Sequence, residues 1–381
     1  MKKILILSNY YLPGYKAGGP IQSIANLVEH LDENFDFKVI TKDRDIGDER
    51  SYDGIKVDGW NFVDNANVYY HSPNKFDLKV ISNLLKNTEY NILYLNSFFS
   101  KKYAIYPLIL KKLNIINKPI VLAPRGELSK GALSLKRKKK ILFINITKVL
   151  GLYKNIIWHA TNELEKAEIK KIFGENISVK IASNLPKMVN NHDNLKRINK
   201  DKGKIKIIYL SRITPKKNLK FALNLLKEIK DLDIEFNIYG GISDKGYWKE
   251  CEMIIEQMPP SVKVKYNGPI SHNLVSGKFR SNHVFLLPTL GENYGHVIYE
   301  SLSNGCVPII SDQTPWGKIN DLKAGCSISL ESTSKYISVI KKFTAMDNTE
   351  FSVYSNNAIN YANSYVYDQN LIEESMLIFE D

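Results

Sequence analysis

The chain has 381 residues, of which 44% are hydrophobic and 24% are charged, with a formal net charge of +13. Its length exceeds what one hydrophobic core usually serves, so two domains are expected. Three widely spaced cysteines exclude a disulfide framework or a zinc site, and no run approaches the roughly 18 apolar residues of a membrane-spanning helix. We therefore expect a cytoplasmic protein.

The first half of the chain alternates short apolar runs with helical patterns. The run at 4–8 soon meets Tyr, Pro and Gly, so we interpret it as a buried strand rather than an export signal. Further strands are predicted at 37–41, 91–96, 119–123, 156–160 and 178–182, and helices at 21–31, 101–113, 133–152 and 163–173. Strands separated by helices predict βαβ units and a parallel sheet.

The second half repeats this alternation after a polar stretch rich in Asn, Asp and Lys. Strands are predicted at 205–210, 235–239, 262–266, 283–287, 307–311 and 327–330, and helices at 219–230, 247–257, 296–304 and 334–343, with two more within 350–379. We predict an α/β protein of two Rossmann-like domains, at 1–184 and 205–365, joined by a linker at 185–204. The C-terminal helix at 366–381 is expected to pack back on the first domain.

The stretch at 288–312 carries the clearest chemical pattern. An apolar strand enters a loop that contains Glu292 and Gly295, and Glu300 follows about two turns into the next helix. Such a loop presents free backbone amides and two carboxylates to one ligand, and carboxylates suit sugar hydroxyls because each accepts two hydrogen bonds. The alternative is that Glu292 only complements the helix dipole and that Glu300 faces solvent.

A second pattern follows the first strand of the second domain. Arg212 and Lys217 lie five residues apart on one loop, so both can reach a single diphosphate. Glycosidic cleavage leaves negative charge on a phosphate oxygen, and without a metal-ligand cluster in the sequence, side-chain cations must stabilise that charge. The alternative is a surface lysine run at the start of a helix.

Together these patterns resemble the retaining GT-B glycosyltransferases of family four, also called glycosyl transferases group 1. Those enzymes show a Glu-x7-Glu signature, matched here by Glu292 to Glu300, and an Arg–Lys loop, matched by Arg212 and Lys217. The resemblance implies two parallel sheets facing across a cleft that binds a nucleotide diphosphate sugar, without metal or cofactor. It also implies an α-linked product from the usual α-linked donor.

The resemblance assigns roles to particular residues. Glu292 is expected to hold donor hydroxyls and stabilise positive charge, while Arg212 and Lys217 neutralise the leaving diphosphate. Glu300 is expected to bind the ribose diol. Further predicted substrate contacts lie in the glycine loop, beside the reacting sugar, in the base-recognition loop and after Glu292: Gly18, Gly19, Arg125, Gly126, Gly268, Pro269, Asn293, Tyr294, Gly295 and His296.

A basic run precedes an apolar stretch in the first domain. Its cations are Lys136, Arg137, Lys138, Lys139 and Lys140. This combination is typical of contact with an anionic membrane surface, where an undecaprenyl-diphosphate-linked acceptor would reside, although a solvated charged face gives the same pattern. We therefore predict a peripheral association with the inner face of the plasma membrane.

The sequence thus favours a hexosyltransferase that uses a nucleotide sugar, with a UDP-sugar preferred, and acts on a lipid-linked glycan of lipopolysaccharide O-antigen or capsule. One alternative is a sugar-nucleotide epimerase of the same fold, which requires a set of His and carboxylate groups that we cannot assemble. The other is a basic α/β protein that binds nucleic acid, for which the chain shows no recognised motif.

Overall fold

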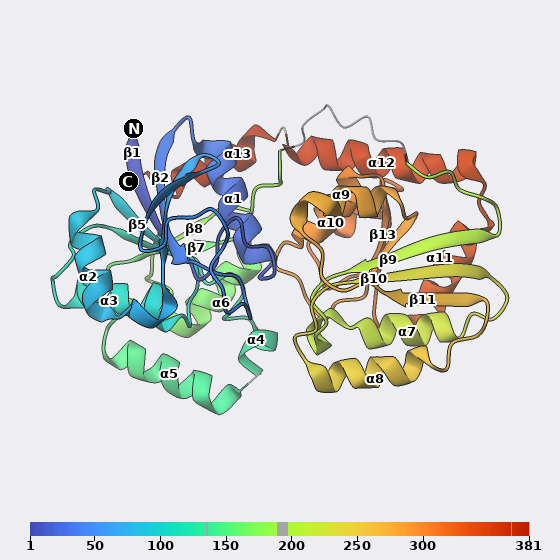
Figure 1. The fold of residues 1–381 in the computed structure, drawn as a ribbon, viewed down its shortest axis with the longest axis horizontal. Helices are drawn as coiled ribbons and strands as arrows, with labels where there is room; N and C mark the ends of the chain where they lie inside the picture. The colour runs from blue at the N-terminus through green and yellow to red at the C-terminus, as the bar shows by residue number, and fades with distance from the viewer. Residues whose placement is uncertain (135, 189–196, 367, 381) are drawn as a thin grey trace. The chain divides into compact units, whose positions relative to one another are not determined.

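The computed structural model describes residues 1–134, 136–188, 197–366 and 368–380. The chain divides into two compact units, drawn as a ribbon in Figure 1. Unit 1 comprises Met1–Met188 with Asp368–Asp381, and unit 2 comprises Val189–Tyr367. Residues 189–196 of the predicted linker lie outside the described residues.

The sheet of unit 1 has the strand order β3-β4-β2-β1-β5-β6-β7-β8. Its strands are β1 (Lys2–Leu7), β2 (Phe35–Lys42), β3 (Gly59–Val63), β4 (Ala66–His71), β5 (Ile92–Leu95), β6 (Ile120–Leu122), β7 (Ile157–Ala160) and β8 (Val179–Ile181). The pairings are parallel except that of the edge strand β3 with β4. The carboxyl ends of the parallel strands therefore meet at one edge of the sheet.

Helices cover both faces of this sheet. They are α1 (Gly19–Leu31), α2 (Leu78–Asn87), α3 (Tyr106–Lys112), α4 (Lys130–Ser134), α5 (Arg137–Val149), α6 (Glu163–Phe173) and α13 (Gln369–Leu377). Because side chains alternate along a strand, Leu5 and Leu7 pack with residues of α2, α3 and α6, whereas Ile4 and Ile6 pack with α1. Helix α13 contacts α1, so the C-terminal segment belongs to the core of unit 1.

The sheet of unit 2 is parallel throughout, with the strand order β11-β10-β9-β12-β13-β14. Its strands are β9 (Lys204–Leu210), β10 (Asp233–Tyr239), β11 (Val262–Tyr266), β12 (Val284–Leu287), β13 (Val307–Ser311) and β14 (Cys326–Ile328). This is the doubly wound order of a Rossmann fold, in which the first strand lies beside the fourth. The change in winding direction falls between β9 and β12, the place where such sheets bind ligands.

The helices of unit 2 also lie on two faces. They are α7 (Leu219–Lys227), α8 (Lys245–Ile255), α9 (His272–Arg280), α10 (His296–Ser303), α11 (Thr333–Ala345) and α12 (Asn348–Val366). Figure 1 shows α7 and α8 below the sheet and α9, α10 and α12 above it. The two successive α/β domains predicted from the sequence are confirmed as two parallel-sheet units.

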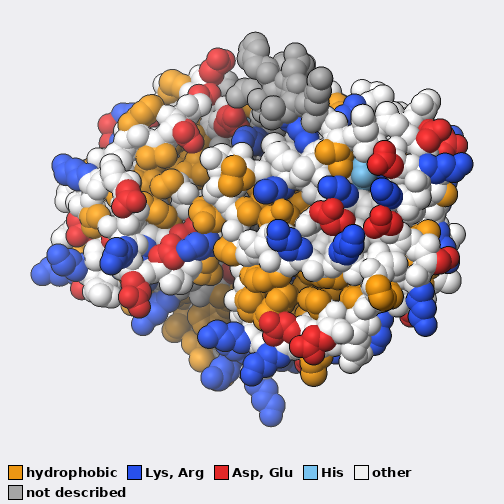
Figure 2. Space-filling view, turned by 45° about the vertical axis from the view of Figure 1, so that its right-hand side comes forward, with side chains coloured by type: hydrophobic (Ala, Val, Ile, Leu, Met, Phe, Trp, Pro, Cys, Tyr) orange, Lys and Arg blue, Asp and Glu red, His pale blue; other side chains and the backbone are white. Residues whose placement is uncertain are grey.

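Charged groups are spread over the face of the molecule that Figure 2 shows. Figure 2 shows basic, acidic and hydrophobic side chains interspersed on one face, with a group of basic side chains at its lower edge. Among the described residues, no helix has both the length and the apolar character that crossing a membrane requires.

Candidate functional site

Two loops of unit 2 meet where the winding of the sheet changes direction. One follows β9 and carries Lys217 at the end of a short 3-10 helix (Pro215–Lys217), and the other follows β12 and carries Glu292. Strands β9 and β12 are direct neighbours. The backbone joins the loops, because the Leu290 N–H donates to the Lys216 carbonyl at 2.8 Å. The two motifs identified in the sequence are thus adjacent in space.

The ammonium group of Lys217 and the carboxylate of Glu292 form an ion pair between these loops. Both side chains are mostly buried, with exposed fractions of 17% and 10%. The buried Thr289 connects the two loops beside the pair. Its hydroxyl donates to the Lys216 carbonyl at 3.2 Å and accepts from the Gly291 N–H at 3.3 Å. A cation and a carboxylate are therefore held together at the carboxyl edge of the sheet.

Helix α10 begins at His296, four positions after Glu292. Gly295 precedes its first residue with a φ of 82°, in the left-handed region that favours glycine. Tyr294 is buried against Trp316, whose indole N–H donates to the Tyr294 carbonyl at 2.5 Å. The Tyr294 side chain therefore belongs to the core, and this segment can offer a ligand only backbone groups at that position. The ring of His296 packs beside Tyr294, with 4.7 Å between centroids.

Glu300 lies one turn further into α10 and contacts His272, the first residue of α9. The distance from Glu300 Oε1 to His272 Nδ1 is 3.5 Å, and the two side chains are 14% and 25% exposed. Helix α9 follows β11 and the turn that contains Gly268 and Pro269. The second glutamate of the signature is thus linked to the predicted base-recognition loop.

Arg212 follows β9 at the same edge of the sheet, but the contacts do not bring it to the ion pair. Its side chain is exposed and has no hydrogen-bond or ion-pair partner within the part of the chain that the structure describes. The backbone beside it is tightly packed. Gly240, at the end of β10, has a φ of 141°, and a Cβ atom there would lie 1.9 Å from the Ser211 carbonyl oxygen. Gly240 also donates its N–H to the Gly268 carbonyl at 2.9 Å.

Residues 190–349, which contain these loops, match the family model described as Glycosyl transferases group 1. The matched residues lie within unit 2, so this part of the chain is similar to that family of glycosyltransferases. The match, together with the doubly wound sheet, indicates an enzyme that transfers a sugar from a nucleotide sugar. The match favours the transferase over the epimerase and the nucleic-acid-binding alternatives.

Solved structures show the same GT-B fold. Sucrose-phosphate synthase from Thermosynechococcus elongatus superposes with a TM-score of 0.73 at 13% identity, covering 100% of this chain and 98% of its own. HepE from Anabaena, solved with UDP and glucose, gives 0.69 at 14% identity over 100% and 99% of the two chains. An uncharacterized 41.2 kDa protein in the cps region of Klebsiella pneumoniae is 23% identical over 273 residues, 70% of this chain and 72% of its own.

In unit 1, the residues predicted to face the substrates lie after β1 and β6. Gly18 precedes α1 with a φ of 68°. Asn96 connects this turn to Arg125, because its amide donates to the Pro20 carbonyl at 3.4 Å and its oxygen accepts from Arg125 Nε at 2.7 Å. Gly19, exposed at the first turn of α1, stands beside this connection. The loops thus form one polar surface within unit 1.

The guanidinium of Arg125 is held by further hydrogen bonds. It donates to the Tyr94 hydroxyl at 2.7 Å and to the Asn184 side chain. Gly126 donates its N–H to the buried carboxylate of Glu165 at 2.6 Å. These contacts give Arg125 a structural role, and a contact of Arg125 with the transferred sugar or the acceptor stays a prediction.

Sequence reasoning missed several residues of these sites. Thr289, which lies within the stretch at 288–312 but was given no role, and His272, Gly240 and Asn96, which lie outside the recognised motifs, each act through a contact with a residue distant in the chain. The only local signals are a Thr after Pro288 and a double glycine after a predicted strand, both of which are common in loops.

We expect acid to destabilise unit 1 through His159. Its ring accepts from Tyr94 and donates to the Ala182 carbonyl, and burial, with the charge of Arg125, lowers its pKa to about 3. In the unfolded chain the ring binds a proton below about pH 6.5. The stability is therefore complete above that pH, and the free energy of unfolding falls by about 1.4 kcal/mol per pH unit between about pH 6 and 4.5.

Urea unfolding of the wild type and of His159→Gln over this pH range measures the effect. The variant should be less stable at neutral pH, but its free energy of unfolding should depend less steeply on pH. Equal slopes for the two proteins would show that His159 is not the group that titrates.

Proposed function

We propose that this glycosyltransferase moves a hexose or N-acetylhexosamine from a nucleotide diphosphate sugar, with a UDP-sugar favoured, to a glycan acceptor. The observation that carries the proposal is the Lys217–Glu292 pair at the winding change of the unit 2 sheet. In the reaction the bond between the anomeric carbon and the phosphate oxygen breaks, and its electrons remain on the diphosphate. The acceptor oxygen then bonds to the anomeric carbon on the same face and gives its proton to the departing diphosphate.

Each residue of the site has a part in this scheme. Lys217 and the exposed Arg212 neutralise the leaving diphosphate, which is where negative charge develops. Glu292 turns from Lys217 to the donor hydroxyls and stabilises positive charge on the sugar ring, while Glu300 accepts from the ribose diol. The backbone of residues 293–296 holds sugar and phosphate oxygens, and the turn at 268–269 holds the base.

Several similar proteins support the choice of substrates. HepE of Anabaena was solved with UDP-glucose, and TarM of S. aureus with UDP. WaaG is described as a glycosyltransferase of lipopolysaccharide biosynthesis, and the Klebsiella relative lies in a cps region. We therefore favour a lipid-linked acceptor of O-antigen or capsule assembly and a cytoplasmic location.

A donor screen tests this function. UDP-glucose, UDP-galactose, UDP-N-acetylhexosamines and GDP-sugars are incubated with the protein, and released nucleoside diphosphate is measured. One donor should give release above the spontaneous rate, and a glycan acceptor should accelerate it. Release from none of them, with UDP failing to bind, would contradict the proposal.

Helix α5 supports a membrane-bound acceptor. It carries no acidic residue, and its first turn and the residue before it include Lys136, Arg137, Lys138 and Lys139, all exposed. Leu142, Ile146 and Val149 follow at spacings of four and three residues and are 61%, 50% and 88% exposed. An exposed apolar stripe beside unopposed cations fits the surface of an anionic membrane. Lys140 differs, because it donates to the Ala132 carbonyl at 2.6 Å.

Replacing Leu142 and Ile146 with Glu should weaken binding to anionic vesicles about tenfold or more, since the stripe loses apolar area and gains negative charge. Flotation with vesicles of phosphatidylglycerol and phosphatidylcholine measures the bound fraction. The matched control is Leu164→Glu on α6, where an apolar side chain is 79% exposed outside the stripe. Equal flotation of the double variant and the control would overturn the role of α5.

A further inference from the structure

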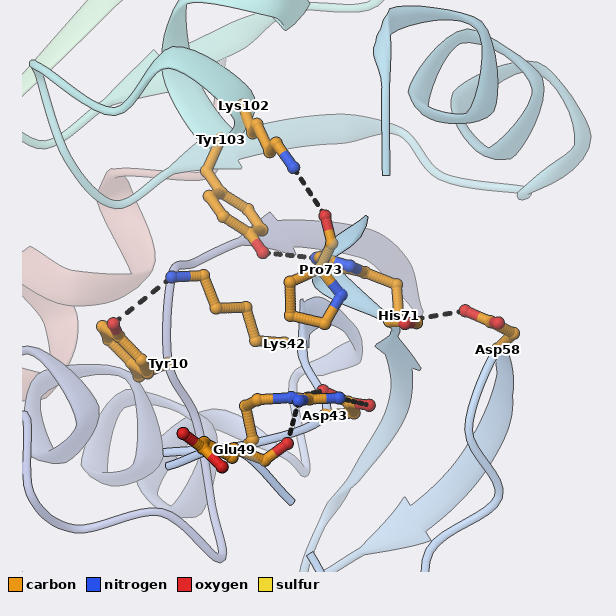
Figure 3. A network of polar contacts seen from close by, with 11 residues as sticks. Tyr10, Lys42, Asp43, Glu49, Asp58, His71, Pro73, Lys102 and Tyr103 are labelled. Carbon is orange, nitrogen blue, oxygen red and sulfur yellow. Dashed lines mark hydrogen bonds and ion pairs between the residues drawn. The ribbon is translucent and has the colours of Figure 1, made fainter. Parts of the chain in front are cut away.

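A second polar cluster lies at the carboxyl edge of the unit 1 sheet, away from the motifs used so far. The neighbouring parallel strands β4, β2, β1 and β5 end there. The segments at these ends supply Tyr10, Lys42, His71 and, on the π-helix after β5 (Lys101–Ile105), Lys102 and Tyr103. Figure 3 shows these side chains gathered from four parts of the chain.

Lys42 and Lys102 are the cations of this cluster, and both contact only neutral groups. Lys42 Nζ lies 3.3 Å from the Tyr10 hydroxyl and 4.5 Å from the centre of its ring. Lys102 Nζ donates to the Pro73 carbonyl at 2.8 Å. Both side chains are partly buried, and neither forms an ion pair with any carboxylate of the described residues.

The surrounding charges compensate these two lysines only in part. Burial, followed by the charges of Lys42 and Lys101, lowers the pKa of Lys102. The acidic groups around the cluster are engaged elsewhere: Asp77, whose charge opposes this lowering, accepts the Val80 N–H at 2.9 Å, and Asp43 accepts from Arg44 at 2.7 and 3.0 Å. Partly buried cations that repel one another are stabilised when an anion binds between them.

The His71 side chain of the cluster is held in place by its neighbours. His71 is 1% exposed, its ring stacks on Phe76 with 3.5 Å between centroids, and it hydrogen-bonds the Tyr103 hydroxyl. Burial lowers the pKa of His71 to about 4, so the ring is neutral at physiological pH. The residues that pack beside the two lysines are therefore fixed in position and uncharged, which reduces the entropy lost when the lysines bind a ligand.

We propose that Lys42 and Lys102 bind an anionic group, a carboxylate or a phosphate, of the acceptor glycan. The inference rests on the proposed function, because it needs a second substrate. The diphosphate of the donor already has Arg212 and Lys217 in unit 2, so the unit 1 lysines are left for the other substrate. The acceptor is therefore an acidic sugar or a phosphate-bearing one, rather than a neutral oligosaccharide.

Binding of small anions to the full-length protein tests the proposal. With UDP present at saturation, the protein is titrated with D-glucuronate, inorganic phosphate and neutral D-glucose by ligand-observed NMR. Glucuronate or phosphate should bind and glucose should not. Lys42→Gln and Lys102→Gln should each weaken the anion about tenfold, because a charged hydrogen bond is lost. Binding of glucuronate indicates a uronic acid acceptor, and binding of phosphate indicates a phosphorylated one.

Matched variants separate charge from structure. Lys38 lies on β2 like Lys42, but its ammonium group donates to the Glu89 carbonyl at 3.1 Å. The Lys38→Gln variant should therefore bind anions like the wild type. Lys42→Arg and Lys102→Arg keep the charge and should restore most of the affinity. Unchanged anion binding in a Lys42→Gln, Lys102→Gln double variant overturns the proposal.

The affinity for UDP distinguishes this inference from the function on which it rests. UDP affinity should be unchanged in both Gln variants, since UDP contacts unit 2. A parallel loss of UDP affinity would assign the lysines to the donor and overturn the acceptor site. If the wild type binds no UDP at all, the proposed function fails, whereas the anion titration without UDP still reports on Lys42 and Lys102.

Discussion

Lys217→Ala and Glu292→Ala should each lower kcat/KM for the nucleotide sugar by about 10²–10³-fold, the usual effect of removing a group that stabilises charge in the transition state. Loss of Lys217 leaves the departing diphosphate with one cation fewer. Loss of Glu292 removes the acceptor of the sugar hydroxyls and leaves Lys217 without its partner. Steady-state kinetics on released nucleoside diphosphate measure both effects.

The double variant provides a sharper test of this pair. Because each partner holds the other in place, the losses should not add, and Lys217→Ala with Glu292→Ala should be little worse than the poorer single variant. Two additive losses would mean that the residues act independently of their contact.

An exposed ion pair of the same unit serves as the control. Lys220 Nζ lies 2.7 Å from Glu250, and the two side chains are 46% and 50% exposed. Exposed pairs contribute little to stability, so Lys220→Ala and Glu250→Ala should change kcat/KM less than about twofold. Wild-type turnover in both Lys217→Ala and Glu292→Ala would remove these residues from the site.

The repeated α/β pattern could be predicted because buried parallel strands are short apolar runs with turn residues between them. The elements that were missed lack that signal. Strands β3 and β4 form an antiparallel edge hairpin in which exposed and buried residues alternate, and β3 exposes the large side chains of Trp60 and Phe62. Helix α9 contains Gly277 and buries only Val275 and Phe279, so its helical period is weak.

The sequence led to the residues of the candidate site, whose roles stay predictions, but not to their contacts. Spacing identified Lys217 and Glu292 as separate ligands of one donor, whereas their direct pairing arises from the adjacency of β9 and β12. The contact of Glu300 with His272 spans 28 positions of the chain and has no local signal. Pairings of this kind depend on strand order, which a single sequence does not specify.

The second large effect concerns a glycine that no motif contains. Gly240→Ala should destabilise unit 2 by about 3 kcal/mol or more, because it introduces backbone strain and a steric clash together. The φ of 141° is unfavourable for any residue with a Cβ, and that atom would lie 1.9 Å from the Ser211 carbonyl oxygen. Relief requires movement of the backbone next to Arg212. The melting temperature of unit 2 should fall by about 6–12 °C.

The neighbouring residue gives a control of the same chemistry. A Cβ at Gly241 would meet no heavy atom within 4 Å, so Gly241→Ala should change stability by less than about 1 kcal/mol. Calorimetry measures stability, and UDP titration below the melting temperature measures the site. Because Ser211 precedes Arg212 and Gly240 hydrogen-bonds Gly268, Gly240→Ala should also weaken UDP binding. Equal melting temperatures for the two variants would show that the backbone at Ser211 moves away from the added Cβ atom at little cost in stability. The close approach of β10 to Ser211 would then not be what positions Arg212.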